Sequence, residues 1–88
     1  MRANRNYILR EIAGEAMLIP VGEAAMAVNG MITLNPAAQC IWQQLEAGKD
    51  EAAILAALLQ EFDVDADTAA ADLRETLALM REKGMLEE

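Results

Sequence analysis

The first third of the chain carries the short apolar runs that are typical of strands. The segment YILREI (Tyr7–Ile12) alternates loosely between apolar and polar residues, and Ala13-Gly14 supplies a turn after it. The apolar run AMLIPV, residues 16–21, is too short for a helix and is bounded by glycines, which predicts a second strand. Pro20 has no N–H for a sheet ladder, so it belongs at the strand end or on an edge. Residues 31–34 (MITL) form the third predicted strand.

The connection GEAAMAVNG, between the second and third predicted strands, permits two interpretations. Asn29-Gly30 is a strong type I′ hairpin signal and would turn the chain between AMAV and MITL. Alternatively, the chain turns at Gly22-Glu23, and Asn29-Gly30 forms a bulge in the third strand. In both interpretations residues 31–34 are the last strand before the helices and can form an edge of the sheet.

After this strand the apolar spacing becomes helical, and three helices are predicted, over residues 36–47, 51–62 and 66–83. Asn35 suits the N-cap of the first, and Pro36 suits its first position, where no N–H is needed. Asp50 caps the second helix and the acidic link DVDAD caps the third. The side chains expected to face inward from the first two helices are Ala38, Ile41, Trp42, Leu45, Ile54, Leu55, Leu58, Leu59 and Phe62.

The third predicted helix carries a second stripe beside its core stripe, when residues are placed at about 100° intervals. The core stripe consists of Ala66, Ala69, Ala70, Leu73, Leu77, Met80 and Gly84. The flank stripe consists of Asp72, Thr76, Leu79 and Lys83, and Arg74 and Arg81 lie on the opposite flank. Leu79 therefore lies off the core arc. An exposed leucine is ordinary on a protein surface, and the alternative is a groove beside the sheet that a partner fills.

Composition and charge narrow the classes of function. The 88 residues suffice for one small domain, whose core must be aliphatic because 55% of residues are hydrophobic but only 3% aromatic. A net charge of −8 argues against nucleic acid as a partner. One cysteine excludes an internal disulfide and fits a reducing compartment. No apolar run approaches the roughly 20 residues of a membrane span or forms a signal peptide. We expect a soluble, cytoplasmic protein that does not bind membranes.

The residues that carry enzyme chemistry are scarce. The chain has no histidine, and Cys40 lies past the free N–H groups of the first predicted helix, with nothing nearby to activate a thiolate. Asp63, Asp65 and Asp67 have the spacing of a calcium loop, but Thr68 and Arg74 stand where that loop requires glycine and glutamate. We therefore expect no catalytic residue, metal site or cofactor, and a protein that is not an enzyme.

The order of elements predicts an α+β fold: a three-stranded antiparallel sheet followed by three helices, in one domain over residues 1–88 with residues 1–6 flexible. It resembles a winged helix-turn-helix in which the wing comes first. An exposed last strand can accept an extended peptide as an additional strand. The alternatives are a DNA-binding winged-helix regulator, which the negative charge opposes, and a structural subunit whose edge strand pairs with a second copy in a homodimer.

Three segments carry a resemblance to a known family. They are MLIPVG, then NGMITLNPAAQCIWQQLEAG, and ILAALLQEFDVDADTAAADLRETLALMREKGML. In this order they resemble the PqqD-like family of coenzyme PQQ synthesis protein D, over nearly the whole chain. The resemblance implies the fold of a RiPP recognition element, RiPPs being ribosomally made, post-translationally modified peptides. It also implies a non-catalytic peptide chaperone that binds the leader of a precursor peptide and presents it to a modifying enzyme, often a radical-SAM protein.

The resemblance also implies a site. In the family the leader adds as a strand to the third β-strand and packs against the third helix. This places backbone pairing on Met31, Ile32 and Thr33, with Val28 as a further candidate, and side-chain contacts on Asp72, Thr76 and Leu79. The opposite flank of the third helix, with Arg74 and Arg81, is the alternative wall.

Overall fold

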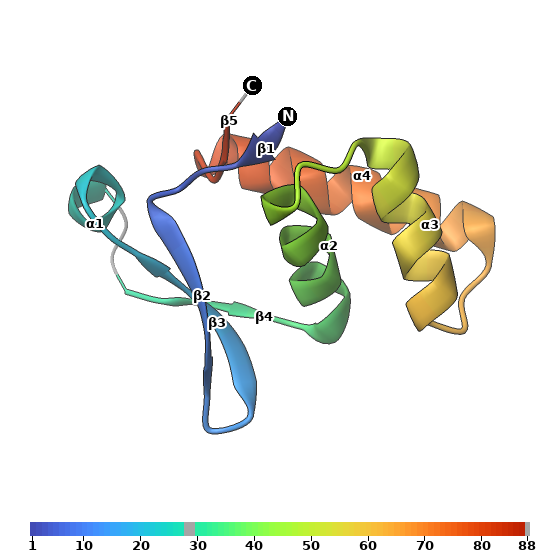
Figure 1. Cartoon of the computed structure of the whole chain (residues 1–88), viewed down its shortest axis with the longest axis horizontal. Coiled ribbons are helices and arrows are strands. Elements are labelled where there is room, and N and C mark those ends of the chain that lie inside the picture. The colour runs from blue at the N-terminus through green and yellow to red at the C-terminus, as the bar shows by residue number, and fades with distance from the viewer. Residues whose placement is uncertain (28–29, 88) are drawn as a thin grey trace.

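The computed structural model describes residues 1–27 and 30–87 and shows a sheet to one side of a group of helices (Figure 1). In chain order the elements are β1 Arg2–Ala3, β2 Tyr7–Ile12, β3 Glu15–Pro20, α1 Glu23–Ala27, β4 Ile32–Leu34, α2 Pro36–Glu46, α3 Glu51–Glu61, α4 Ala66–Glu82 and β5 Leu86–Glu87. The predicted α+β fold, a three-stranded antiparallel sheet followed by three helices, is confirmed. Three short elements, β1, α1 and β5, were not predicted.

The main sheet has the strand order β2-β3-β4, and all its pairs are antiparallel. Ile12 lies opposite Glu15, so β2 and β3 are joined by a two-residue hairpin. Ala13 and Gly14 in that hairpin have φ angles of 53° and 81°. Positive φ at both positions is the requirement of a type I′ turn, which matches the right-handed twist of the strands. The turn predicted at Ala13-Gly14 is therefore confirmed. The strand order places β3 in the middle of the sheet and β4 at one edge.

The connection from β3 to β4 contains a short helix that neither sequence-based interpretation included, although the second interpretation did place a turn at Gly22-Glu23. Instead of a strand, residues 23–27 form the short helix α1, which follows a turn at Gly22 with φ of 59°. The sequence EAAMA consists of good helix formers, which accounts for this helix, whereas the predicted turn at Asn29-Gly30 lies partly outside the described residues. Val28 and Asn29 lie outside the described residues, so the structure does not place the expected contribution of Val28 to the site.

Residues 1–6, which we expect to be flexible, include the short strand β1. Strand β1 pairs with β5 in a separate two-stranded sheet, which brings the two ends of the chain together (Figure 1). Asn4 strengthens this junction, since its Nδ2 donates to the carbonyl of Gly84 over 2.9 Å and its Oδ1 accepts from the N–H of Asn6 over 2.9 Å. Two-residue strands produce no periodic signal in a sequence, which explains why they were missed.

The three long helices begin where their capping residues predicted. The side chains of Asn35, Asp50 and Asp65 each accept a hydrogen bond from the backbone N–H three residues later, over 2.8, 2.9 and 2.8 Å. Each bond satisfies one of the donors left free at a helix N-terminus. The caps thus fix where α2 starts after β4 and where α4 starts after the acidic link.

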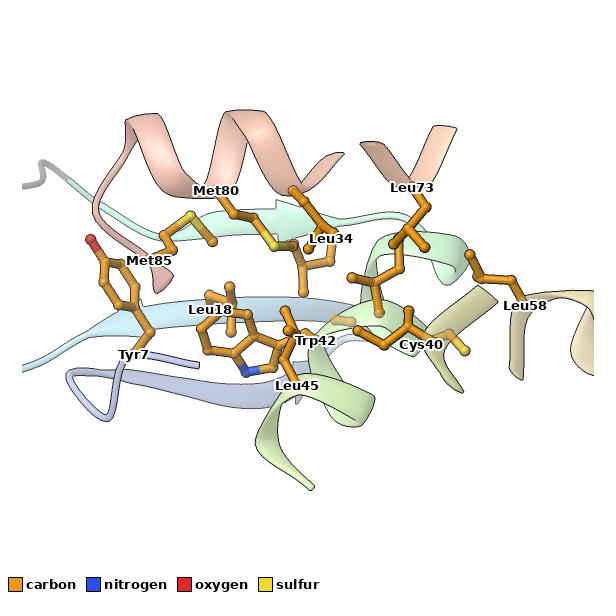
Figure 2. Close-up of a cluster of buried hydrophobic side chains, with 14 of the residues drawn as sticks. Tyr7, Leu18, Leu34, Cys40, Trp42, Leu45, Leu58, Leu73, Met80 and Met85 are labelled. Carbon is orange, nitrogen blue, oxygen red and sulfur yellow. The ribbon is translucent and has the colours of Figure 1, made fainter. Parts of the chain in front are cut away.

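The core lies where α2 and α4 cover the inner face of the sheet (Figure 2). Trp42 is fully buried, and its ring meets that of Tyr7 edge to face at 6.3 Å between centroids. The other side chains with less than 2% exposure are Leu18, Ile41, Leu45, Ile54, Leu73 and Leu77. Leu59 is an exception to the prediction, because it is 39% exposed on the outer side of α3. Ala38, Leu55 and Phe62 are half-buried.

Candidate functional site

A groove of about 420 Å³ lies between the start of α2, the end of α3 and one flank of α4. Its lining residues are Asn35, Ala37, Ile41, Leu58, Phe62, Val64, Ala69, Asp72, Glu75, Thr76 and Leu79. Ile41 and Leu58 are buried and extend the apolar core into the groove, whereas Phe62 and Val64 are half-buried. The groove is therefore apolar at its base and carries its polar groups mainly on α4.

Besides the buried Ala69, the α4 wall of the groove consists of Asp72, Glu75, Thr76 and Leu79. These residues have the i, i+3, i+4, i+7 spacing that places side chains on one side of a helix. The neighbouring core side of α4 carries Leu73, Leu77 and Met80, which are all buried. Three members of the predicted flank stripe, Asp72, Thr76 and Leu79, therefore face the groove, whereas Lys83 does not line it. Within the described residues the alternative flank, with Arg74 and Arg81, does not line the groove either.

Leu79 is the most conspicuous residue of this wall, because half of its surface is exposed. A large apolar side chain at the edge of a hollow offers contact area to a partner without being needed in the core. Glu75 lies on the same wall but was absent from the predicted stripe. Its spacing of three residues from Asp72 was the signal that could have identified it.

The edge strand leads directly into the groove. Leu34 is the last residue of β4, and the next residue, Asn35, lines the groove. Within the described residues β4 pairs only with β3, so the other edge of β4 has no strand beside it. The groove therefore begins where β4 ends. The structure brings Asp72, Thr76 and Leu79 together in the groove, next to this edge.

The predicted strand residues take different positions at the edge. Ile32 is half-buried and packs against the core, and Leu34 is buried, whereas Thr33 is exposed. Thr33 lines a second hollow, together with Gly14 and Gln39, and is not among the residues that line the groove. Met31 is 55% exposed and precedes β4 instead of belonging to it, so the predicted strand starts one residue too early.

Cys40 and the groups that could hold a metal ion complete the chemistry of the described residues. Cys40 is buried, and this burial, with a smaller effect of Glu61, raises the pKa of its thiol above the ordinary value. Residues 1–27 and 30–87 contain no group of three or more His, Cys, Asp or Glu side chains that could hold a metal ion. Among the helices described, none is long and apolar enough to cross a membrane.

Comparisons with known proteins agree with this architecture. Two solved structures cover 99% of this chain. The first is TbiB1 in complex with the TbiA(beta) leader peptide, with a TM-score of 0.80, 28% identity and 95% of its own chain covered. The second is lasso peptide synthetase B1 complexed with the leader peptide, with a TM-score of 0.78, 22% identity and 96% of its chain covered. At 22% identity, the likeness to the second structure concerns the fold alone.

No curated protein matches the chain. The family model described as coenzyme PQQ synthesis protein D (PqqD), however, matches residues 15–86. This match begins at the first residue of β3 and ends at the first residue of β5, so it includes β4, the groove and all of α4. The chain therefore belongs to the PqqD family.

Proposed function

We propose that this protein is a non-catalytic peptide chaperone that binds the leader of a ribosomally synthesised precursor peptide. The observation that carries the proposal is the continuity of the unpaired β4 edge with the apolar groove beside α4. Family membership and the likeness to TbiB1, whose structure contains a leader peptide, support the same function.

Strand addition would use the backbone of β4. Alternate residues of an antiparallel strand direct their N–H and C=O groups to the same side, so an edge strand offers hydrogen bonds to a second neighbour at every other residue. Such bonds supply affinity, and side-chain pockets supply specificity. In this protein the pocket is the groove, where Leu79, Ile41 and Leu58 would receive an apolar side chain of the leader.

Presentation requires a second partner, a peptide-modifying enzyme. A bound leader would lie on the surface of the domain, between β4 and α4, so the remainder of the precursor would stay free for that enzyme. A radical-SAM enzyme is the class that family membership suggests. Co-purification of a radical-SAM enzyme encoded beside the gene, only when its precursor peptide is present, would support this assignment.

Leader binding is tested by titrating the ¹⁵N-labelled protein with peptides encoded beside its gene. The expected result is a set of amide shift changes over β4 and along the groove side of α4, with none beyond the noise on β2. If every neighbouring peptide left both β4 and α4 unchanged, the proposal would be wrong. A change confined to β1 and β5 would also contradict it, because it would place the peptide at the other end of the molecule.

A further inference from the structure

We infer that Asp72 and Glu75 select precursor peptides that carry a basic side chain close to an apolar anchor; this rests on the proposed function. Asp72 and Glu75 are the charged residues among those that line the groove, and both are acidic. The other polar groups of the lining, Asn35 and Thr76, are neutral. The groove therefore combines an apolar base with two negative charges on one wall.

The two carboxylates are available to a ligand. Both side chains are exposed, and within the described residues neither forms a hydrogen bond or an ion pair. Arg74 lies between them in sequence, but its position in the helix places it off the groove wall. Neither charge is thus committed to holding the fold, and a basic group brought into the groove would meet both.

Charge around the groove reinforces this selection. Between residues 61 and 80 there are six acidic side chains and one basic side chain, a net −5 of the chain's −8. By contrast, residues 1–10 contain three arginines and no acidic residue. Clustered charge of one sign raises the local concentration of oppositely charged ligands and speeds their association. A cationic leader would be drawn to the groove end of the molecule.

The geometry sets where the basic residue stands in the leader. Asp72 and Leu79 are seven residues apart, which is about 10 Å along a helix. Side chains on the same face of a strand recur about every 7 Å. When a leader strand runs along α4 with an apolar anchor against Leu79, the next side chain on the same face lies about level with Glu75 and on the side of Asp72. A lysine or arginine two residues from the anchor is therefore the expected feature.

The test uses a displayed library of random peptides, about 12 residues long so that they can cover both β4 and the groove, selected on the full-length chain. Lysine or arginine should be enriched two residues from a large apolar residue. Peptides so selected should bind Glu75→Lys about fivefold more weakly, and Glu75→Gln about twofold more weakly. Binding to the unaltered protein should also weaken as salt rises from about 0.05 to 0.5 M.

Glu82→Lys is the matched control, because it makes the same change of net charge on the same helix but outside the groove. Binding to this variant should stay within about twofold of the unaltered protein, since exposed charges at a distance are screened. Circular dichroism of all variants checks that the fold is retained.

Two results would overturn the inference, and they differ in what they say of leader binding itself. If peptides that shift the β4 and α4 amides show no enrichment of basic residues, or if Glu82→Lys weakens binding as much as Glu75→Lys, charge selection by these carboxylates is wrong while leader binding stands. If no selected peptide perturbs β4 or the groove, both the inference and the proposed function fail.

Discussion

Thr33 of β4 lies directly opposite Met17 of β3, and β3 is the sole strand that pairs with β4 in the described part of the chain. Backbone groups of β4 that point away from β3 are therefore open to solvent or to a peptide. We expect their amides to exchange rapidly in the free protein and slowly once a leader is bound. Hydrogen exchange followed by NMR, with and without peptide, measures this directly.

The alternating direction of the backbone N–H groups along β4 makes this prediction more specific. Protection should appear either at Thr33 alone or at Ile32 and Leu34 together, because neighbouring residues of a strand point their N–H groups to opposite sides. The outer edge of β2 is the internal control, since it is the other edge of the same sheet. New protection on β2 instead of β4 would show that the leader binds at the other edge of the sheet, and this would contradict the proposed site.

Replacement of Leu79 by aspartate should weaken leader binding at least tenfold, because it removes the apolar contact and places a charged group where the apolar anchor of the leader would be buried. Leu79 is half exposed, so the free energy of unfolding should fall by less than about 1 kcal/mol. Fluorescence anisotropy of a labelled leader and urea unfolding measure the two effects separately.

Leu59→Asp is the control for this change. Leu59 is 39% exposed on α3 and does not line the groove. The substitution alters hydrophobicity and charge by the same amounts, but leader affinity should not change. Equal losses of affinity in the two variants would indicate a general charge effect and would contradict the role given to Leu79.

Cys40 should react slowly with thiol reagents in the folded protein. Only 7% of its surface is exposed, and burial raises the pKa of the thiol, so little thiolate exists near neutral pH. Labelling with an iodoacetamide dye should accelerate strongly in about 6 M urea, where the chain is unfolded. Rapid labelling of the native protein at pH 7 would instead indicate an activated thiol and would contradict the non-catalytic interpretation.

The parts of the fold that the sequence predicted are those with strong local signals. Asn35 and Asp50 cap their helices as expected, and Ile41 and Leu58 are buried, because capping chemistry and helical spacing depend on neighbouring residues alone. The helix α1 before β4 was missed because its five residues are too few for a periodic apolar pattern. Strand β1 had no local signal, because it exists only through its pairing with β5.

The residues of the candidate site also differ in whether a local signal could predict them. Spacing placed Asp72, Thr76 and Leu79 on one stripe of α4, and the structure places that stripe on the groove. The sequence could not choose between the two flanks, because the choice depends on how α4 packs against α2 and α3. The contribution of Phe62 and Val64 to the groove could not be predicted for the same reason, because their positions depend on the path of the link between α3 and α4.

The cap of α4 predicts how stability depends on pH. Thr68 donates its backbone N–H to Asp65 over 2.8 Å and its hydroxyl over 3.0 Å, and these bonds, the backbone bond foremost, lower the pKa of the Asp65 carboxyl. A carboxyl whose folded pKa lies below its unfolded value stabilises the fold fully above the unfolded pKa of about 4. This contribution is lost as the pH falls through the folded pKa.

Asp65→Asn isolates this effect, because an asparagine at the cap can still accept the N–H of Thr68 but cannot titrate. The unaltered protein should be the more stable of the two at pH 7, and the difference should shrink below about pH 4 as Asp65 takes up a proton. Urea unfolding of both proteins between about pH 7 and 2.5 measures the difference, and all other carboxyls cancel because they are common to both. A constant difference across this range would mean that the charge of Asp65 does not contribute to the cap, and the start of α4 would then be fixed by the hydrogen bonds of the cap without help from its charge.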